Sequence, residues 1–239
     1  SNIAIGRSCL TNATGSTMTH VVGVGTGCMT SLTTGGRNAA FGGNDVMNSM
    51  TTGTDNTAMG YHCNRFTTTA SENSFFGKEA GTGKQDGSAN QTAGKNAGFG
   101  FKAGFLIQGD ATQNSLFGSE AGSAITTGDG NICIGYQAGL ALTTPDNNTV
   151  IGTQARYEDS PTATGDTAIG YQAMYSGSAG QNVAVGHKAL YTAGGSDQCV
   201  AIGYQAGYTT AEDAGTFVGW NAGKLSTSYR STAIGHSAG

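Results

Sequence analysis

Large apolar residues recur along the chain at a nearly fixed interval, and a glycine directly follows each one. The positions are Ile5, Val22, Phe41, Met59, Phe76, Phe99, Phe117, Ile134, Ile151, Ile169, Val185, Ile202, Val218 and Ile234. These 14 copies are separated by 16 to 19 residues, except for one interval of 23, and 229 residues divided among 13 intervals give a mean period of about 17.6. Such a period predicts a repeat architecture, in which each copy forms one unit that stacks on the next.

The residues around each apolar position predict a β-strand. Two places earlier stand mainly β-branched or small residues, which share a strand face with the apolar column because side chains alternate. They are Ile3, Thr57, Ile132, Thr149, Thr167, Val183, Val200, Thr216 and Thr232. The position between the two columns is small or apolar: Ala4, Val21, Ala40, Ala58, Phe75, Leu116, Cys133, Val150, Ala168, Ala184, Ala201, Phe217 and Ala233. Both faces of the strand are therefore expected to be buried.

The two faces are expected to have different partners. We predict that the large apolar column is the structural core inside a coil, and that the small-residue face packs against a second chain, because small side chains permit a close approach. In the alternative, a single solenoid with a wide cross-section, the small-residue face closes within one chain.

The residues that flank the strand predict bends and turns. Alanine stands three places after the glycine in ten copies, and a second glycine stands four places after it in eight, as expected where the backbone bends. Asparagine stands four places before the first glycine at Asn2, Asn38, Asn56, Asn73, Asn96, Asn114, Asn131, Asn148 and Asn182, where stacked copies can hydrogen-bond to backbone and to each other. The 23-residue interval contains an enlarged turn at Lys84–Lys95. Gly100 is its repeat glycine, since Gly94 would place Ala93 in the apolar column.

The fold expected from these columns is all-β: a parallel β-solenoid (β-roll) of about 14 coils with a repeat near 17–18 residues, in which one strand face packs against another chain. Each coil contains a strand, a glycine bend, a shorter second strand and a variable turn. Residues 1–239 form a single repeat region. Both ends of the sequence fall inside repeat copies, which predicts a window of a longer fibre chain.

Composition narrows the class of protein. Glycine accounts for 41 of 239 residues, more than twice the usual share. The sequence nevertheless has only two prolines and no regular glycine at every third position, which excludes collagen. Charged residues are only 11% at 37% hydrophobic content, which argues against a disordered chain. A net charge of -4 argues against a nucleic-acid partner, and no apolar run is long enough to span a bilayer.

No catalytic, cofactor-binding or metal site is predicted. The cysteines, Cys9, Cys28, Cys63, Cys133 and Cys199, lack a C-x-x-C pair and are interpreted as small hydrophobic residues. The four histidines do not cluster in the sequence. Of 15 acidic residues, only Asp45, Glu79, Glu120 and Asp166 fall within the repeat frame, so the paired carboxylates of a glycosidase are not indicated, and we expect no enzyme.

Three repeat copies carry a family resemblance: DTAIGYQAM (Asp166–Met174), CVAIGYQAG (Cys199–Gly207) and NICIGYQAG (Asn131–Gly139). They resemble the glycine-rich repeats of phage tail fibres and similar virion fibres, including those of marine cyanophages, and the head repeats of trimeric autotransporter adhesins. The resemblance covers nearly the whole chain and implies a parallel β-roll in an intertwined or tightly packed homotrimer. Adhesin head repeats are typically shorter, which favours the fibre group.

The function that the resemblance implies is structural. The chain is expected to be a fibre shaft of a virion that presents its turns for host attachment, located on the virion surface or outside the cell. Its expected partners are further copies of itself, other virion or fibre components, and a host cell-surface glycan or protein. A bacterial trimeric adhesin head is the alternative. An ice-binding solenoid is a remote one, because the threonine column is interrupted.

Two groups of residues are candidates for contact with a host. Aromatic residues directly after the repeat glycine, Tyr61, Tyr136, Tyr171, Tyr204 and Trp220, could stack on sugar rings or, alternatively, pack over neighbouring coils. The turns Lys84–Lys95 and Tyr157–Thr164 are the better candidates, because loops on a rigid scaffold tolerate change.

Overall fold

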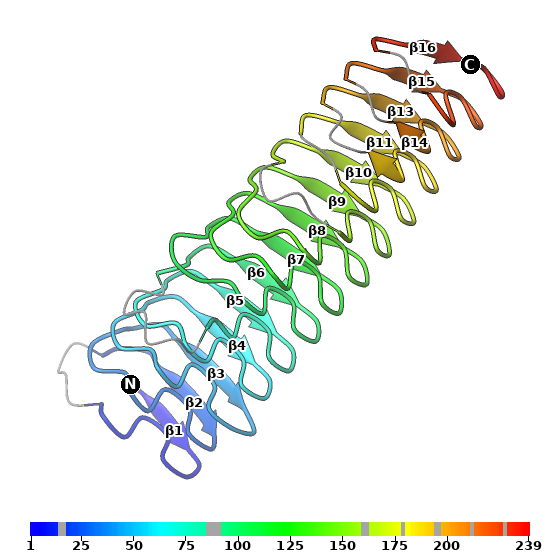
Figure 1. Ribbon diagram of the computed structural model, residues 1–239. Coiled ribbons are helices and arrows are strands. Elements are labelled where there is room, and N and C mark those ends of the chain that lie inside the picture. Colours follow the sequence, from blue (N-terminus) through cyan, green and yellow to red (C-terminus); the bar gives the residue numbers. More distant parts are fainter. Residues whose placement is uncertain are drawn as a thin grey trace. The chain divides into compact units, whose positions relative to one another are not determined.

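The computed structural model describes residues 1–13, 18–84, 92–158, 163–177, 180–193, 197–210, 213–226 and 229–239. The chain divides into two compact units, Ser1–Asp129 and Gly130–Gly239. In each unit, strands from successive repeats pair in parallel and in the order of the sequence (Figure 1). The prediction of an all-β parallel β-solenoid with a repeat of about 17 residues is confirmed.

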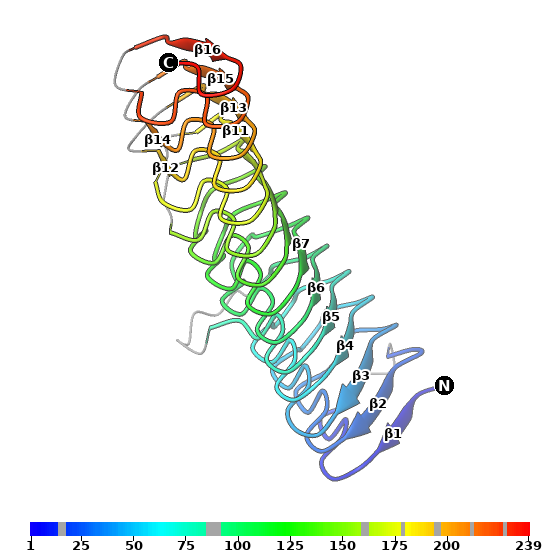
Figure 2. The same ribbon diagram turned by 90° about the vertical axis from the view of Figure 1, so that its right-hand side faces the viewer.

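In the first unit, each repeat contributes one strand to the stack. The strands are β1 (Ile3–Ile5), β2 (Val22–Gly25), β3 (Ala39–Gly42), β4 (Thr57–Met59), β5 (Ser74–Phe76), β6 (Ala97–Phe99) and β7 (Ser115–Phe117). The strands of this unit lie along one side of the coils, and bends and turns complete each coil (Figure 2). Phe76 pairs with Phe99, which confirms Gly100 as the repeat glycine after the enlarged turn.

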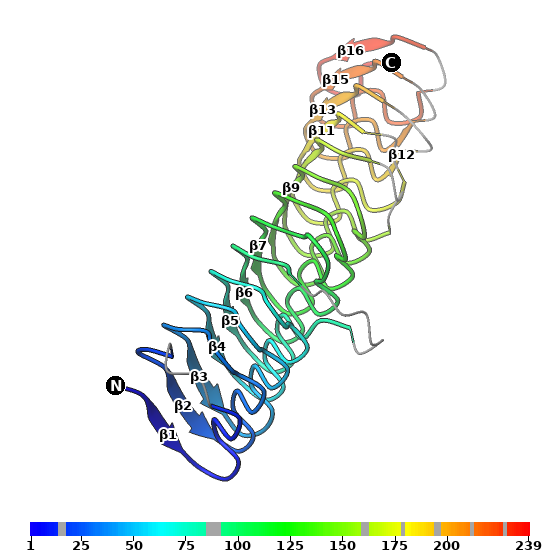
Figure 3. The ribbon, with the colours of Figure 1, turned by 90° about the vertical axis from the view of Figure 1, so that its left-hand side faces the viewer.

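The second unit repeats this arrangement (Figure 3). Its main strands are β8 (Ile132–Ile134), β9 (Thr149–Ile151), β10 (Thr167–Ile169), β11 (Val183–Val185), β13 (Val200–Ile202), β15 (Thr216–Val218) and β16 (Thr232–Ile234). The expected second strand of the coil occurs, within the described residues, only as the pair β12 (Thr192–Ala193) and β14 (Thr209–Thr210). Counted over the described residues, seven stacked strands bound six complete turns in each unit.

Each coil closes through a fixed series of left-handed backbone positions. Around Gly186, which has a φ of 139°, Gln181, Lys188 and Leu190 have φ values of 59°, 55° and 46°. Non-glycine residues seldom adopt this conformation, which costs roughly 1–2 kcal/mol each. The stacking hydrogen bonds offset this cost: the N–H of Lys188 donates to Tyr171 in the preceding coil (2.9 Å), and that of Leu190 to Ala206 in the following coil (3.0 Å).

The repeat glycine is required by two independent constraints. Its φ lies in a region that only glycine adopts readily, and the neighbouring coil approaches closely. A Cβ on Gly186 would lie 2.4 Å from the carbonyl oxygen of Gly203, and the same relation holds between Gly203 and Gly219. The two constraints act together at most repeat glycines, whereas Gly42 has only the close approach, to Gly60, and Gly235 has only the left-handed φ.

The predicted assignment of the two strand faces is reversed within the chain. The middle residue of the strand, such as Ala168 or Ala201, points into the coil and is fully buried. The large apolar column, which the sequence placed in the core, lies on the outer face: Ile134 and Ile202 are 40% and 42% exposed. The correction applies to the whole column, namely Ile5, Phe41, Met59, Phe76, Phe99, Phe117, Ile134, Ile151, Ile169, Val185, Ile202, Val218 and Ile234, which are exposed or half-buried. Small residues predominate at the inward strand position, and larger buried side chains from the rest of the coil, such as Met174 in the coil of Ala168, fill the interior.

The second repeat requires a correction of register by two residues. Val24, not Val22, pairs with Ile5 and with Phe41, so Gly25 is the repeat glycine of this copy. Val22 pairs with Ile3 and lies two residues before Val24, on the same outer face of the strand. The local sequence Val22–Gly25 alternates valine and glycine, which makes both registers compatible with the apolar pattern.

Large interior side chains are accommodated by glycines that face them. A Cβ on Gly81 or Gly98 would lie 2.5 Å from the ring of Phe75, and one on Gly223 would lie 2.0 Å from the ring of Phe217. Glycine therefore does two things in this chain: it bends the backbone, and it leaves space inside the coil for the two buried phenylalanines. This complementarity keeps the interior close-packed.

The predicted asparagine column forms a buried hydrogen-bonded ladder. The Oδ1 atom of Asn56 accepts from the backbone N–H of Asn73 at 3.0 Å, and that of Asn73 accepts from Asn96 at 3.0 Å. The Nδ2 atom of Asn73 donates to the carbonyl of Ala93 at 2.8 Å. In the second unit Asn148 bonds to Asn131 in the same way. The expectation of stacked asparagines that bond to backbone and to one another is confirmed.

One pair of charged side chains lies inside the second unit. Asp166 occupies the asparagine column, and Arg156 occupies the second left-handed position, where most copies have glycine or an apolar residue. Both are buried, and the guanidinium of Arg156 lies 3.3 Å from the carboxylate of Asp166. It also donates to the carbonyl of Ala163 at 2.8 Å. Each side chain neutralises the charge of the other, and either charge alone would be costly to bury in the coil interior.

Candidate functional site

The outer face of the main sheet exposes large apolar side chains in both units. It consists of the large apolar column and the column two places before it, and in the described strands neither column holds a charged residue. Among its members, Met59, Phe99, Phe117, Ile132, Ile134 and Ile202 are exposed. A contiguous exposed apolar patch of this kind marks an interaction surface more often than a surface that faces water.

Three phenylalanines on this outer face of the first unit stack on one another. The ring centroids of Phe76 and Phe99 are 4.7 Å apart, those of Phe99 and Phe117 are 4.9 Å apart, and the planes are inclined by 6°. The flat faces of the rings contact one another between successive coils, so the ring edges point outward. The ladder forms a firm apolar ridge on the outer face.

The aromatic residues after the repeat glycine form a second ladder in the second unit. Tyr171, His187, Tyr204, Trp220 and His236 stack with centroid separations of 5.2, 5.0, 5.8 and 4.5 Å. All five side chains belong to exposed residues. Each interior ring of the ladder has a neighbour over both faces, so stacking on a sugar face is sterically blocked there. The interpretation that these residues pack over neighbouring coils is supported for this part of the column.

The other two candidates in that column lie in different surroundings. Tyr61 contacts the adjacent His62, with ring centroids 3.8 Å apart and planes inclined by 33°, and Lys78 lies 5.8 Å from its ring centroid. Tyr136 is exposed. The structure therefore does not bring all five predicted aromatic residues together: three of them share one ladder, with two histidines between and beyond them.

A further tyrosine ladder was not predicted from the sequence. Tyr157, Tyr175, Tyr191 and Tyr208 stack at 5.1, 5.1 and 4.9 Å, and all four are half-buried. Burial, followed by the charge of Glu158, raises the pKa of Tyr175. The four residues share the position five places after the repeat glycine, and this common spacing is the signal in the sequence that could have revealed the ladder.

Charged side chains gather on the first unit around Asp45. Its carboxylate lies 3.0 Å from the guanidinium of Arg65 and 3.9 Å from Nε2 of His62. Burial, followed by the charge of Arg65, lowers the pKa of His62. Lys102 lies 3.7 Å from Glu79 in the same region. Opposite charges alternate over this surface, so it has no strong preference for a ligand of either sign.

The cysteines lie at positions that point into the coils. Cys28, Cys63, Cys133 and Cys199 are buried, Cys9 is half-buried, and all five are free thiols. Burial raises the pKa of Cys63 and that of Cys133 to about 12. Among the described residues, no three histidine, cysteine or acidic side chains are grouped so that they could hold a metal ion.

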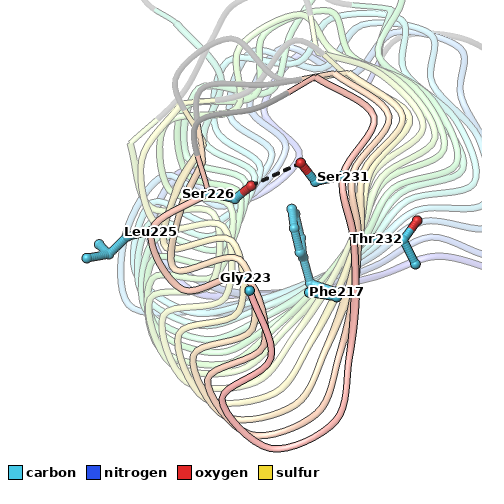
Figure 4. Close-up of a pocket in the computed structure, with 8 residues that line it drawn as sticks. Phe217, Gly223, Leu225, Ser226, Ser231 and Thr232 are labelled. Carbon is cyan, nitrogen blue, oxygen red and sulfur yellow. Dashed lines mark hydrogen bonds between the residues drawn. The ribbon is translucent and has the colours of Figure 1, made fainter.

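A cavity of about 450 Å³ lies at the last coil of the second unit. It is lined by Phe217, Gly223, Leu225, Ser226, Ser231, Thr232, Ala233 and Gly239 (Figure 4). The ring of Phe217 points into it, and the hydroxyl of Ser226 lies 3.3 Å from that of Ser231. Neither an acid nor a base lines it, so the cavity is the coil interior seen from its open end and offers no chemistry of its own.

The two turns predicted to meet a host are only partly described. Within Lys84–Lys95, residues 85–91 lie outside the described residues, and within Tyr157–Thr164 residues 159–162 also lie outside them.

Comparison of the chain with protein-family models, with curated proteins and with solved structures found no match. In the part of the chain that the structure describes, no helix has the length and apolar character needed to cross a membrane.

Proposed function

We propose that this chain is a structural part of a virion fibre, which assembles as a homotrimer through the outer face of its main sheet and presents its turns for attachment to a host surface. The alternative within the same class is the head of a bacterial trimeric adhesin. In either setting the chain acts on the virion surface or outside the cell, and its partners are its own copies, other fibre components and a host glycan or protein.

The observation that carries the proposal is the unbroken apolar column on the outer face. With Val24 in place of Val22, all 14 repeats carry a large apolar residue at this position, although it points away from the coil interior. A solvent-facing column would be expected to vary between polar and charged residues. Burial of apolar surface contributes about 25 cal/mol per Å², so a stack of such residues gives a substantial gain on association.

Association with identical chains explains why the column is uniform along the sequence. In an assembly of parallel copies, each coil meets the equivalent coil of its neighbours, so every repeat needs the same residue type at the contact. A partner of different shape would require apolar residues at only some coils. In the association of identical chains, the ridge formed by Phe76, Phe99 and Phe117 would lie at the centre of the contact, as the aromatic anchors of an interface do.

The solution mass of the chain tests the assembly. Sedimentation equilibrium should give a mass near 72 kDa, three times 24.0 kDa. Ile202→Lys places a charge on the outer face and should reduce the mass toward that of one chain, since three unpaired ammonium groups would be buried together. Thr153→Lys adds the same charge at an exposed bend residue of the same unit and should leave the mass unchanged. A stable monomer of the unmodified chain would refute the assembly.

The biological setting requires a separate measurement. An antibody against the chain should label fibres on purified virus particles, whereas labelling of bacterial envelopes would support the adhesin alternative. Host attachment is tested by replacing Lys84–Lys95 with a turn of the length found in the other repeats. Adsorption to the host should fall while the solution mass remains that of the trimer, and unchanged adsorption would remove this turn from the proposal.

A further inference from the structure

We propose that Cys9 and Cys28 form an oxidisable pair that can close a disulfide between the first two coils of the first unit. Each lies three places after its repeat glycine, Gly6 or Gly25, so the two occupy one column in adjacent coils. Backbone hydrogen bonds hold the two coils in this register on both sides of the cysteines. The N–H of Leu10 donates to the carbonyl oxygen of Cys28 at 3.0 Å, and the N–H of Gly27 donates to the carbonyl oxygen of Arg7 at 2.9 Å.

The spacing of the coils suits a disulfide. Adjacent strands lie about 4.8 Å apart, and disulfides join residues whose Cα atoms are roughly 4.4–6.8 Å apart. Both side chains point into the coil beside Gly23. The position that a Cβ on Gly23 would take is 2.5 Å from Sγ of Cys9 and 3.7 Å from Cβ of Cys28. The missing side chain of Gly23 leaves room for the two thiols.

The other cysteines serve as internal controls. Cys63 lies in the same column, but Val46 occupies the coil between it and Cys28, as the hydrogen bonds Met29 N–H to Val46 and Met47 N–H to Cys63 show. Two coil spacings are too far for a disulfide. Cys133 and Cys199 are buried in the second unit at other positions of the repeat. A reaction confined to Cys9 and Cys28 is therefore distinguishable from general oxidation.

Thiol–disulfide exchange with a small-molecule disulfide supplies the oxidant. The thiolate of Cys9, the more accessible of the two, attacks a sulfur of oxidised glutathione and releases one reduced glutathione. The thiolate of Cys28 then attacks Sγ of Cys9 and releases the second. Two protein thiols are oxidised, one glutathione disulfide is reduced to two thiols, and the two protons remain on the glutathione thiols. Burial raises the pKa of Cys28 to about 11, so the second step should accelerate as the pH rises.

Thiol counting and peptide mass test the proposal on the full chain. After incubation of the folded chain with oxidised glutathione and acid quenching, denaturation should expose three reactive thiols in place of five. Trypsin releases both cysteines on one peptide, Ser8–Arg37, whose mass should fall by two hydrogens. Cyanogen bromide then cleaves after Met18 and Met29, and the fragments Ser8–Met18 and Thr19–Met29 should separate from each other only after reduction.

Alanine variants control the assignment, because alanine occupies this column in most other repeats and should be accommodated. Cys9→Ala and Cys28→Ala should abolish the loss of two hydrogens, whereas Cys63→Ala should retain it. The oxidised chain should also unfold at a higher temperature than the reduced chain, and this difference should be absent in Cys28→Ala. Five reactive thiols after oxidation, a glutathione adduct that persists on Ser8–Arg37, or loss of the product in Cys63→Ala would each overturn the proposal.

Discussion

Asn56 and Asn73 lie in successive coils, and the side-chain oxygen of Asn56 accepts a hydrogen bond from the backbone N–H of Asn73 at 3.0 Å. The same relation links Asn73 to Asn96, so each asparagine supplies the acceptor that the next coil needs at the start of its strand. All three side chains are fully or almost fully buried. The ladder is thus part of the coil interior, where an unmade hydrogen bond is costly.

Replacement of one ladder member should destabilise the first unit. Asn73→Ala leaves the N–H of Asn96 and the carbonyl of Ala93 without their present partners in the interior. At about 1–3 kcal/mol for each of these two unsatisfied buried groups, we expect a loss of roughly 2–6 kcal/mol in the free energy of unfolding. Denaturant unfolding measures it. Asn2→Ala, in the same column but exposed, should cost less; equal costs would show that burial of the ladder is not the cause.

The repeat glycine should not tolerate a side chain. Gly77 has a φ of 142°, and a Cβ on it would lie 2.3 Å from the carbonyl oxygen of Gly100. Gly77→Ala should therefore destabilise the unit by about 1–3 kcal/mol from backbone strain, with a further cost from the clash. Gly43→Ala is the matched control, because nothing lies within 4 Å of a Cβ there. Thermal unfolding of both variants decides it, and similar midpoints would contradict the role assigned to the close approach.

The buried ion pair should respond non-additively to substitution. Asp166→Asn restores the residue common in that column but leaves the charge of Arg156 without its carboxylate, so we expect a loss of about 3–5 kcal/mol. Adding Arg156→Gly gives the glycine–asparagine combination of Gly139 and Asn148 in neighbouring coils, and should recover most of the stability. A double-mutant cycle by denaturant unfolding measures the coupling, and additive effects would mean that the pair is not energetically linked.

His62 should make the first unit less stable at mildly acidic pH. Burial, followed by the charge of Arg65, lowers its pKa in the folded chain below the ordinary value of 6.5. The folded state therefore favours the neutral ring, and the stability that this contributes is present above pH 6.5 and is lost as the pH falls through the lowered pKa. His62→Gln, with a residue type found at this left-handed position in Gln137 and Gln154, should reduce the dependence of the unfolding temperature on pH between about 7.5 and 5. An unchanged pH dependence would exclude His62 as its source.

The repeat columns predicted much of the backbone because their spacing reflects local constraints. The strand at Thr167–Ile169, the glycine at Gly170 and the asparagine ladder are each set by residue type and by distance along the chain. The register of the second repeat could not be predicted in this way, because the alternation of valine and glycine at Val22–Gly25 fits two registers. Pairing of Val24 with both Ile5 and Phe41 selected one of them.

The sequence by itself determined that the chain is a parallel β-solenoid, which residues share a strand face, and where the chain bends. Only the tertiary structure decided which face lies inside. Alternation with a period of two separates Ala168 from Ile169 but does not say which of them points inward. That depends on the width of the coil and on the groups that fill it from the other side, such as Ala173 and Met174. Where such groups fill the interior, the small side chain points inward and the large apolar column lies outside, where the proposed association would cover it.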